Sequence, residues 1–189
     1  MSRGGSGAVA EQRVHASIWL RLDPQHESQL RALIRRLADG HGTHDFLPHL
    51  TVCGPTLDAT SLGEAARYAR ESESVPLRVR AAAIACAVGN PFQAVFIEIA
   101  NSHELLRFRE DLRRITGADR LAPPHVSLFY AVGRSHTAIA FAATDLEEIA
   151  RHCRAEAGEP EYLLERPAIA YPAAGGNWLR VPEWRVEDL

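Results

Sequence analysis

Alternating and helical patterns of apolar residues follow one another along this chain of 189 residues. Residues 13–22 (RVHASIWLRL) alternate, which predicts a first strand with its apolar side chains on one face. Asp23 and Pro24 then suit the N-cap and first position of a helix. Leucine and isoleucine recur there at helical spacing until Gly40, where we expect the helix to end.

The same two periodicities predict the remaining elements, each bounded by turn or capping residues. The predicted strands are 48–52, 75–88, 93–100 and 124–128, with a closing hairpin of 163–172 and 178–181. The predicted helices begin at Ser61 and Thr144, each the first residue of a capping box, and at Ser102. They end near residues 72, 157 and 116, respectively.

One pentapeptide pattern occurs twice, as PHLTV at 48–52 and as PHVSL at 124–128. Successive side chains of a strand point to opposite faces, so the histidine and the hydroxyl residue share one face while the apolar residues anchor the other. Two imidazoles and two hydroxyls facing one cleft are suited to acid–base chemistry around a phosphate. The candidate residues are His49 and Thr51 in the first copy, and His125 and Ser127 in the second.

A bare His-x-Ser/Thr pattern carries little information in this chain, because His15, His26 and His41 also begin one. The preceding proline and the flanking apolar residues select only the two copies above. His15 lies on a predicted strand but lacks the proline, so we interpret it as an ordinary strand residue.

The two halves of the chain have the same order of features. Each half reads strand, capped helix, glycine stop, short loop and motif strand, which predicts an internal duplication of about residues 13–88 and 93–184. We expect one domain over 13–189. The first twelve residues, MSRGGSGAVAEQ, are interpreted as a disordered leader.

Composition narrows the possible partners. The formal net charge of -3 argues against a broad basic surface for nucleic acid, and all 21 basic residues are arginine, so no lysine nucleophile is available. Three cysteines without a C-x-x-C pair (Cys53, Cys86 and Cys153) fit a reducing compartment. The longest apolar run, 81–88, is too short for a membrane span, so we expect a soluble, cytoplasmic protein with no membrane partner.

A metal site is the main alternative use of the histidines. His41, His44 and His49 lie near Cys53, but a zinc site needs a second cluster, and the only candidate is the adjacent pair at 152–153 on a predicted helix. We therefore favour a site without metal. His44 is interpreted as part of a solvated loop.

The two motifs, followed by Phe129-Tyr130 and preceded by the opening SIWLRL strand, resemble the two-histidine (2H) phosphoesterase superfamily. Within it they look closest to the plant and yeast cyclic phosphodiesterases, over about residues 14–184. The resemblance implies an α+β fold with two pseudo-twofold-related lobes, antiparallel sheets flanked by helices, and an active-site cleft between the lobes. It also implies catalysis with no metal or other cofactor. Ser127 stands where the first motif has threonine, a change that the family pattern allows.

The resemblance also ranks the aromatic residues that could stack on a substrate base. Tyr130 lies at the offset of a ligand-facing tyrosine in the family, and Phe92 follows by the same analogy. Core packing is the more frequent role for both and for Trp19. Trp178 and Trp184 are interpreted as hairpin packing. Arg134 could meet a phosphate or form a surface salt bridge.

The main functional hypothesis is hydrolysis of nucleoside 2',3'-cyclic phosphates, and of ADP-ribose 1'',2''-cyclic phosphate, by a monomeric enzyme. His49 and His125 would act as general acid and base, in an order that the residues leave open. Thr51 and Ser127 would bind the phosphate. One alternative is a 2',5'-linkage RNA ligase or phosphodiesterase acting on tRNA ends, and another is a nucleotide-binding protein without turnover.

Overall fold

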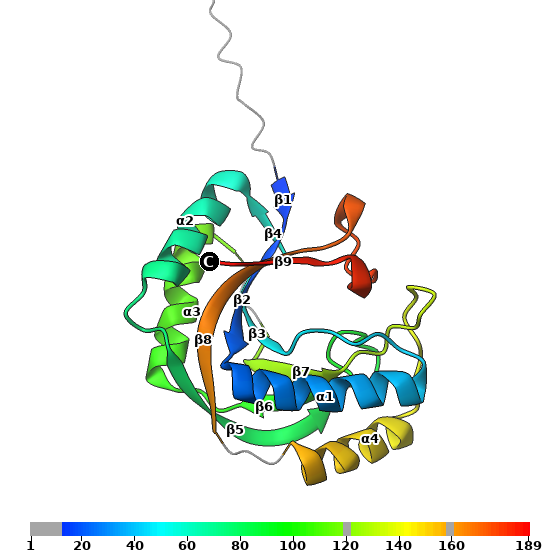
Figure 1. Ribbon diagram of the computed structural model, residues 1–189. Helices are drawn as coiled ribbons and strands as arrows, with labels where there is room; N and C mark the ends of the chain where they lie inside the picture. Colours follow the sequence, from blue (N-terminus) through cyan, green and yellow to red (C-terminus); the bar gives the residue numbers. More distant parts are fainter. Residues whose placement is uncertain (1–12, 119–121, 158–160) are drawn as a thin grey trace, which may run out of the picture.

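The structure, a computed structural model, describes residues 13–118, 122–157 and 161–189; the predicted leader at 1–12 lies outside them. The described chain has the expected α+β fold with antiparallel sheets flanked by helices (Figure 1). The large sheet contains β2 (Ser17–Leu22), β3 (His49–Cys53), β5 (Leu77–Cys86), β6 (Val95–Ile99), β7 (His125–Phe129), β8 (Glu161–Tyr171) and β9 (Arg185–Asp188). A small sheet pairs β1 (Arg13–His15) with β4 (Thr56–Asp58).

The large sheet is organised around the two motif strands. Its order is β2-β3-β7-β6-β5-β8-β9, and β2 also pairs with β8. One lobe is built on β2 and β3, and the other on β5, β6 and β7. The long, curved β8 joins the lobes, because its first half pairs with β5 and its second half pairs with β2.

Apart from β9, which pairs with β8 only, the strand pairing is unchanged when β2, β3 and β5 are exchanged for β6, β7 and β8. A pseudo-twofold relation between the two lobes would produce this symmetry of strand pairing. The duplication itself stays a prediction, with this symmetry of pairing in its favour.

Four helices flank the sheet in the described residues. They are α1 (Pro24–His41), α2 (Ala59–Glu71), α3 (His103–Thr116) and α4 (Ala143–Glu156). Figure 1 shows α2 beside α3 at one end of the molecule and α1 near α4 at the other. None of these helices is long and apolar enough to cross a membrane.

Two predicted helix caps are confirmed and three helix boundaries are wrong. Asp23 caps α1 and Ser102 caps α3. Helix α1 continues through Gly40 to His41, and the left-handed residue is Gly42 with φ of 66°. The expected boxes of Ser61 with Glu64 and Thr144 with Glu147 do not form, because α2 begins one turn earlier and α4 has no side-chain cap. Asp58 caps α2 by accepting from the Ser61 amide at 2.8 Å.

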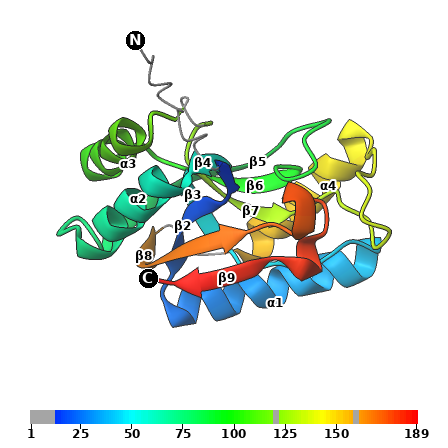
Figure 2. The same ribbon diagram turned by 90° about the horizontal axis from the view of Figure 1, so that it is seen from above.

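The predicted terminal strands also differ from the structure. The first strand is interrupted at Ala16, whose amide donates to the Pro55 carbonyl, so β1 and β2 join different sheets. In the closing hairpin, β8 pairs with β9 at 185–188 rather than with 178–181 (Figure 2). Two short 3-10 turns, Ala174–Gly176 and Val181–Glu183, occupy the intervening segment.

The apolar residues of both motifs anchor the core, as their alternation predicted. The four side chains are at most 1% exposed and pack with the apolar faces of the helices. They are Leu50, Val52, Val126 and Leu128.

Candidate active site

The four candidate polar side chains meet on one face of the sheet. The strands β3 and β7 are antiparallel neighbours in which Leu50 is paired with Val126. This register sets His49 opposite Ser127 and Thr51 opposite His125. Residues directly opposite have Cβ atoms about 5 Å apart, and diagonal residues such as the two histidines about 7–8 Å apart. The two imidazoles are close enough that His125 influences the pKa of His49.

A β-bulge interrupts each motif strand at the same place. The pairing of β3 with β2 shifts by one residue at Val52, and the pairing of β7 with β6 shifts at Leu128. A bulge adds one residue and reverses the facing of those that follow. Cys53 therefore joins Val52 in the core, and the side chain of Tyr130 leaves the main core for a second cluster.

Both histidines are held by the same backbone contact. The Nδ1 atom of His49 lies 2.7 Å from the carbonyl oxygen of Leu47, and Nδ1 of His125 lies 2.9 Å from that of Pro123. A carbonyl can only accept, so Nδ1 carries a proton in each ring and Nε2 is the nitrogen that gains or loses one. The prolines between these partners favour extended backbone before them, which helps to aim each carbonyl at its ring.

His49 occupies the more enclosed position. It is 7% exposed and stacks on Trp19 with ring centroids 3.4 Å apart and planes 8° apart. Burial lowers its pKa to about 3, and the charges of His125 and Arg21 act in the same direction, while the hydrogen bond to Leu47 opposes them. The neutral imidazole is therefore the stable form of His49 over the physiological range.

His125 is partly exposed and has a different neighbour. Its ring meets Phe96 edge-on, with centroids 5.5 Å apart. Burial lowers its pKa, the hydrogen bond to Pro123 opposes this shift, and the charge of Arg109 on α3 adds to it. Across the sheet, His125 is paired with Glu98, whereas His49 is paired with Arg21.

The two hydroxyls are placed alike but bonded differently. Ser127 is 5% exposed and donates to the Phe92 carbonyl at 2.8 Å, so it must rotate to donate to a phosphate. Thr51 is half-buried, and within the described part of the chain its hydroxyl makes no side-chain hydrogen bond. Phosphate binding by these two groups remains a prediction.

Tyr130 and Phe92 belong to an aromatic cluster beside the motif strands. Tyr130 is 4% exposed, stacks on Phe46 at 3.6 Å between centroids and meets Phe92 edge-on. Burial raises its pKa, and a hydrogen bond with Ser127 opposes this rise. Half-buried Phe92 is therefore the more accessible of the two predicted stacking residues.

Trp184 also contacts the candidate site, which the sequence did not indicate. It was expected to pack only within the hairpin, where its Nε1 does donate to the Trp178 carbonyl at 2.9 Å. Its ring also contacts three residues at the site, with centroid distances of 5.8, 6.2 and 5.9 Å to Trp19, Phe92 and Tyr130, respectively. The C-terminal segment therefore covers the residue that stacks on His49.

The other histidines and Arg134 lie elsewhere. Exposed His15 is on β1, and His44 stacks on His136 in the loops after α1 and β7. Arg134 forms an exposed ion pair with Asp39 at 3.2 Å. Among the described residues, no group of three or more His, Cys, Asp or Glu side chains is placed to hold a metal ion.

A cavity of about 700 Å³ lies beside the second motif rather than between the histidines. Its lining comes mainly from α3 and from the segment that leads to His125, and includes Val52, Arg109, Arg113 and Pro124. Neither motif histidine lines this cavity.

The two lobes, with paired motif strands where they meet, define a known phosphoesterase fold. The chain is similar to E. coli LigT complexed with 3'-AMP, with a TM-score of 0.59 at 11% sequence identity over 94% of this chain and 96% of that chain. A structure described as a phosphoesterase gives a TM-score of 0.60 at 11% identity over the same shares. LigT complexed with ATP gives 0.59 at 11%, again over 94% and 96%.

No protein-family model and no curated protein matches the sequence. At these identities the structural likeness establishes the fold. The fold that the 2H resemblance implied is therefore confirmed.

Proposed function

We propose that the chain is a 2H phosphoesterase that hydrolyses nucleoside 2',3'-cyclic phosphates without a metal ion, with ADP-ribose 1'',2''-cyclic phosphate as a related substrate. The observation that carries the proposal is the matched placement of His49 and His125, each with Nδ1 on a backbone carbonyl and Nε2 left for chemistry. The similarity in fold to proteins whose structures hold 3'-AMP and ATP supports a nucleotide substrate.

Hydrolysis of a cyclic phosphodiester needs a base for water and an acid for the departing ribose oxygen. A phosphate between the two rings would receive water activated by one Nε2 while the other Nε2 protonates the leaving oxygen. The hydroxyls of Thr51 and Ser127 would donate to the non-bridging oxygens, where negative charge accumulates in the transition state.

We assign the base to His49 and the acid to His125. A base must be neutral before reaction, and enclosure by Trp19 together with the Arg21 charge favours neutral His49. The acid must carry a proton, and His125 is the more exposed of the two rings, with Arg109, among the described residues, as the one charge that lowers its pKa besides burial. The anionic phosphodiester would further favour protonation of His125.

The test is turnover of 2',3'-cyclic AMP in EDTA. The wild-type protein should yield a nucleoside monophosphate, and His49→Ala and His125→Ala should each lower kcat by about 10²–10⁴-fold, the usual contribution of a general acid or base. The matched control is His15→Ala, which removes a strand histidine that also begins a His-x-Ser pattern and should leave kcat unchanged.

Three outcomes would overturn this assignment. Activity that survives either histidine change would show that this histidine is not a general acid or base. Turnover of 2',5'-linked RNA without turnover of the cyclic nucleotide would favour the RNA ligase or phosphodiesterase reading. Binding of 2'-AMP without turnover of any cyclic substrate would indicate a nucleotide-binding protein.

A further inference from the structure

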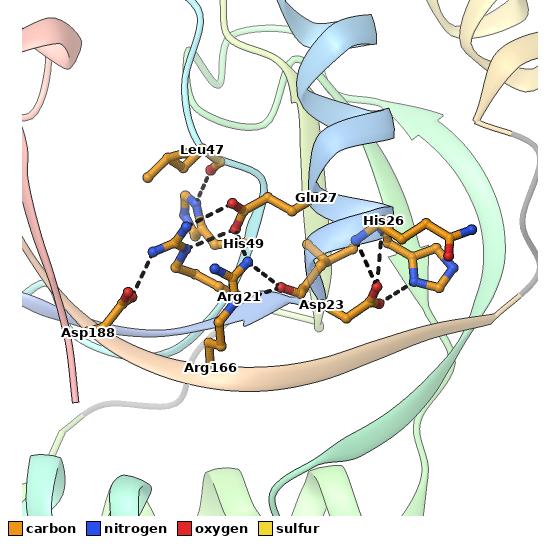
Figure 3. A network of polar contacts seen from close by, with 10 residues as sticks. Arg21, Asp23, His26, Glu27, Leu47, His49, Arg166 and Asp188 are labelled. Carbon is orange, nitrogen blue, oxygen red and sulfur yellow. Dashed lines mark hydrogen bonds and ion pairs between the residues drawn. The ribbon is translucent and has the colours of Figure 1, made fainter.

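Arg21 lies directly across the sheet from His49. The two residues are cross-strand partners in the pairing of β2 with β3, and Figure 3 shows the guanidinium beside the imidazole ring. The Arg21 side chain is only 12% exposed, so its charge is weakly screened by water.

Two carboxylates fix the Arg21 guanidinium. Its Nε and Nη2 donate to both oxygens of Glu27 in the first turns of α1, at 2.9 and 2.7 Å, and its Nη1 donates to Asp188 of β9 at 2.6 Å. A two-pronged guanidinium–carboxylate pair fixes orientation as well as distance. The group is therefore held for a structural or electrostatic purpose and is not left to meet a substrate.

Glu27 is shared with a second arginine. Arg166 of β8 donates to Glu27 at 2.7 Å and to the Leu22 carbonyl at 2.7 Å through the same Nη2 (Figure 3). The network thus joins β2, α1, β8 and β9, and its two arginines and two carboxylates balance in formal charge. Within it, Arg21 is the group opposite His49.

We propose that Arg21 is a positioning residue for His49: its guanidinium, fixed by Glu27 and Asp188, keeps the imidazole in the neutral, Nδ1-protonated form that can accept a proton at Nε2. The role of Arg21 rests on the proposed function, in which His49 is the base, but the protonation of His49 can be measured whatever the protein does. The titratable or charged groups acting on His49 are Arg21 from β2 and His125 from β7, and the carboxylates of Glu27 and Asp188 reach it through Arg21. Trp19, which stacks on the His49 ring, carries no charge.

Two substitutions in the network should shift His49 in opposite directions. Arg21→Gln removes the cation opposite His49 and leaves the network with one negative charge in excess, because Arg166 still pairs with Glu27, so protonation of His49 becomes easier. Glu27→Gln removes an anion and keeps the cation, so protonation becomes harder. A close charge shifts a pKa by about 1 unit or more, which corresponds to at least a roughly tenfold change in the protonation equilibrium.

The measurement is an NMR titration of the His49 ring in the intact chain, down to the lowest pH at which the fold persists. We expect the protonation constant of His49 to rise about tenfold or more in Arg21→Gln and to fall in Glu27→Gln. Arg21→Lys should restore the wild-type value because it keeps the charge. The matched control is Arg78→Gln, the same change at an exposed arginine of β5, which should have no effect.

A purely structural network would give a different result. Arg21→Gln and Glu27→Gln would then lose stability while His49 titrates as in the wild type, or both would change its protonation constant in the same direction. Either result overturns the proposal. If Arg21→Gln does not fold, Arg21→Lys and Glu27→Gln still test it. If the wild-type protein does not turn over cyclic nucleotides, only the proposed function is overturned, because the titration of His49 needs no substrate.

Discussion

The two motif strands have nearly the same backbone and very different surroundings. Each has a histidine bonded through Nδ1 to the carbonyl two residues earlier, a hydroxyl residue two positions later and a bulge directly after it. Each hydroxyl residue is paired with an aromatic residue of the adjacent strand, Trp19 for Thr51 and Phe96 for Ser127. The repeated backbone therefore presents two equivalent Nε2 atoms.

The surroundings make these equivalent atoms chemically unequal. Trp19 lies flat on His49, whereas Phe96 meets His125 only with an edge. The cross-strand residue is the cation Arg21 for His49 and the acid Glu98 for His125. The two rings therefore differ in enclosure and in cross-strand partner, while burial and the charge of an arginine, Arg21 or Arg109, lower the pKa of both.

After the histidines themselves, we expect the largest loss of kcat on removing the two motif hydroxyls. Thr51→Val replaces the hydroxyl with a methyl group of similar size, and we expect kcat for 2',3'-cyclic AMP to fall about 10²-fold, the loss typical of one donor to transition-state charge. Ser127→Ala should lower kcat by a similar factor. It should also cost about 1 kcal/mol of stability, because the Phe92 carbonyl loses its donor.

Kinetics and urea unfolding of both variants measure these effects. Unchanged kcat in both would contradict phosphate binding by the hydroxyls. A stability loss confined to Thr51→Val would contradict a hydrogen bond from Ser127, and none from Thr51, within the described part of the folded chain.

The sequence predicted the motif strands and their core residues because alternation is a local property of the chain. It also placed the caps at Asp23 and Ser102, where a polar side chain precedes a clear helical pattern. It misplaced the start of α2, since Ser61 and Asp58 are both good capping residues and tertiary packing selects between them.

The residues that surround His49 could not be predicted from sequence patterns. Arg21 and Glu27 lie on consecutive elements near the N-terminal end, whereas Arg166 and Asp188 come from β8 and β9 near the other end, and no spacing rule links the two pairs. The contact of Trp184 with Trp19 likewise depends on how the C-terminal segment folds back. The repeated pentapeptide could therefore select the two histidines as candidates but could not show how their environments differ.

A smaller effect concerns stability at acid pH. The folded-state pKa of His49, about 3, lies below its ordinary value of 6.5, so between these values the unfolded chain binds a proton that the folded chain does not. Its contribution to stability is complete above about pH 6.5 and is lost as the pH falls toward 3, with a slope of up to about 1.4 kcal/mol per pH unit.

Urea unfolding at pH 7, 6 and 5 checks this expectation. In the wild type the free energy of unfolding should fall from pH 7 to pH 5, and this fall should be smaller in His49→Gln. The fall in His125→Gln should lie closer to that of the wild type, because His125 is more exposed. Equal slopes in all three proteins would show that the two histidines are not differently enclosed.

The most direct test of unequal roles uses a leaving group that needs no acid. Thymidine 3'-(4-nitrophenyl phosphate) has no neighbouring hydroxyl, and nitrophenolate departs without a proton. If His125 is the acid, His125→Ala should hydrolyse this ester within about tenfold of the wild-type rate, while His49→Ala should remain about 10²-fold or more impaired. Rescue of His49→Ala instead, or of neither variant, would contradict the assignment of His49 as base and His125 as acid.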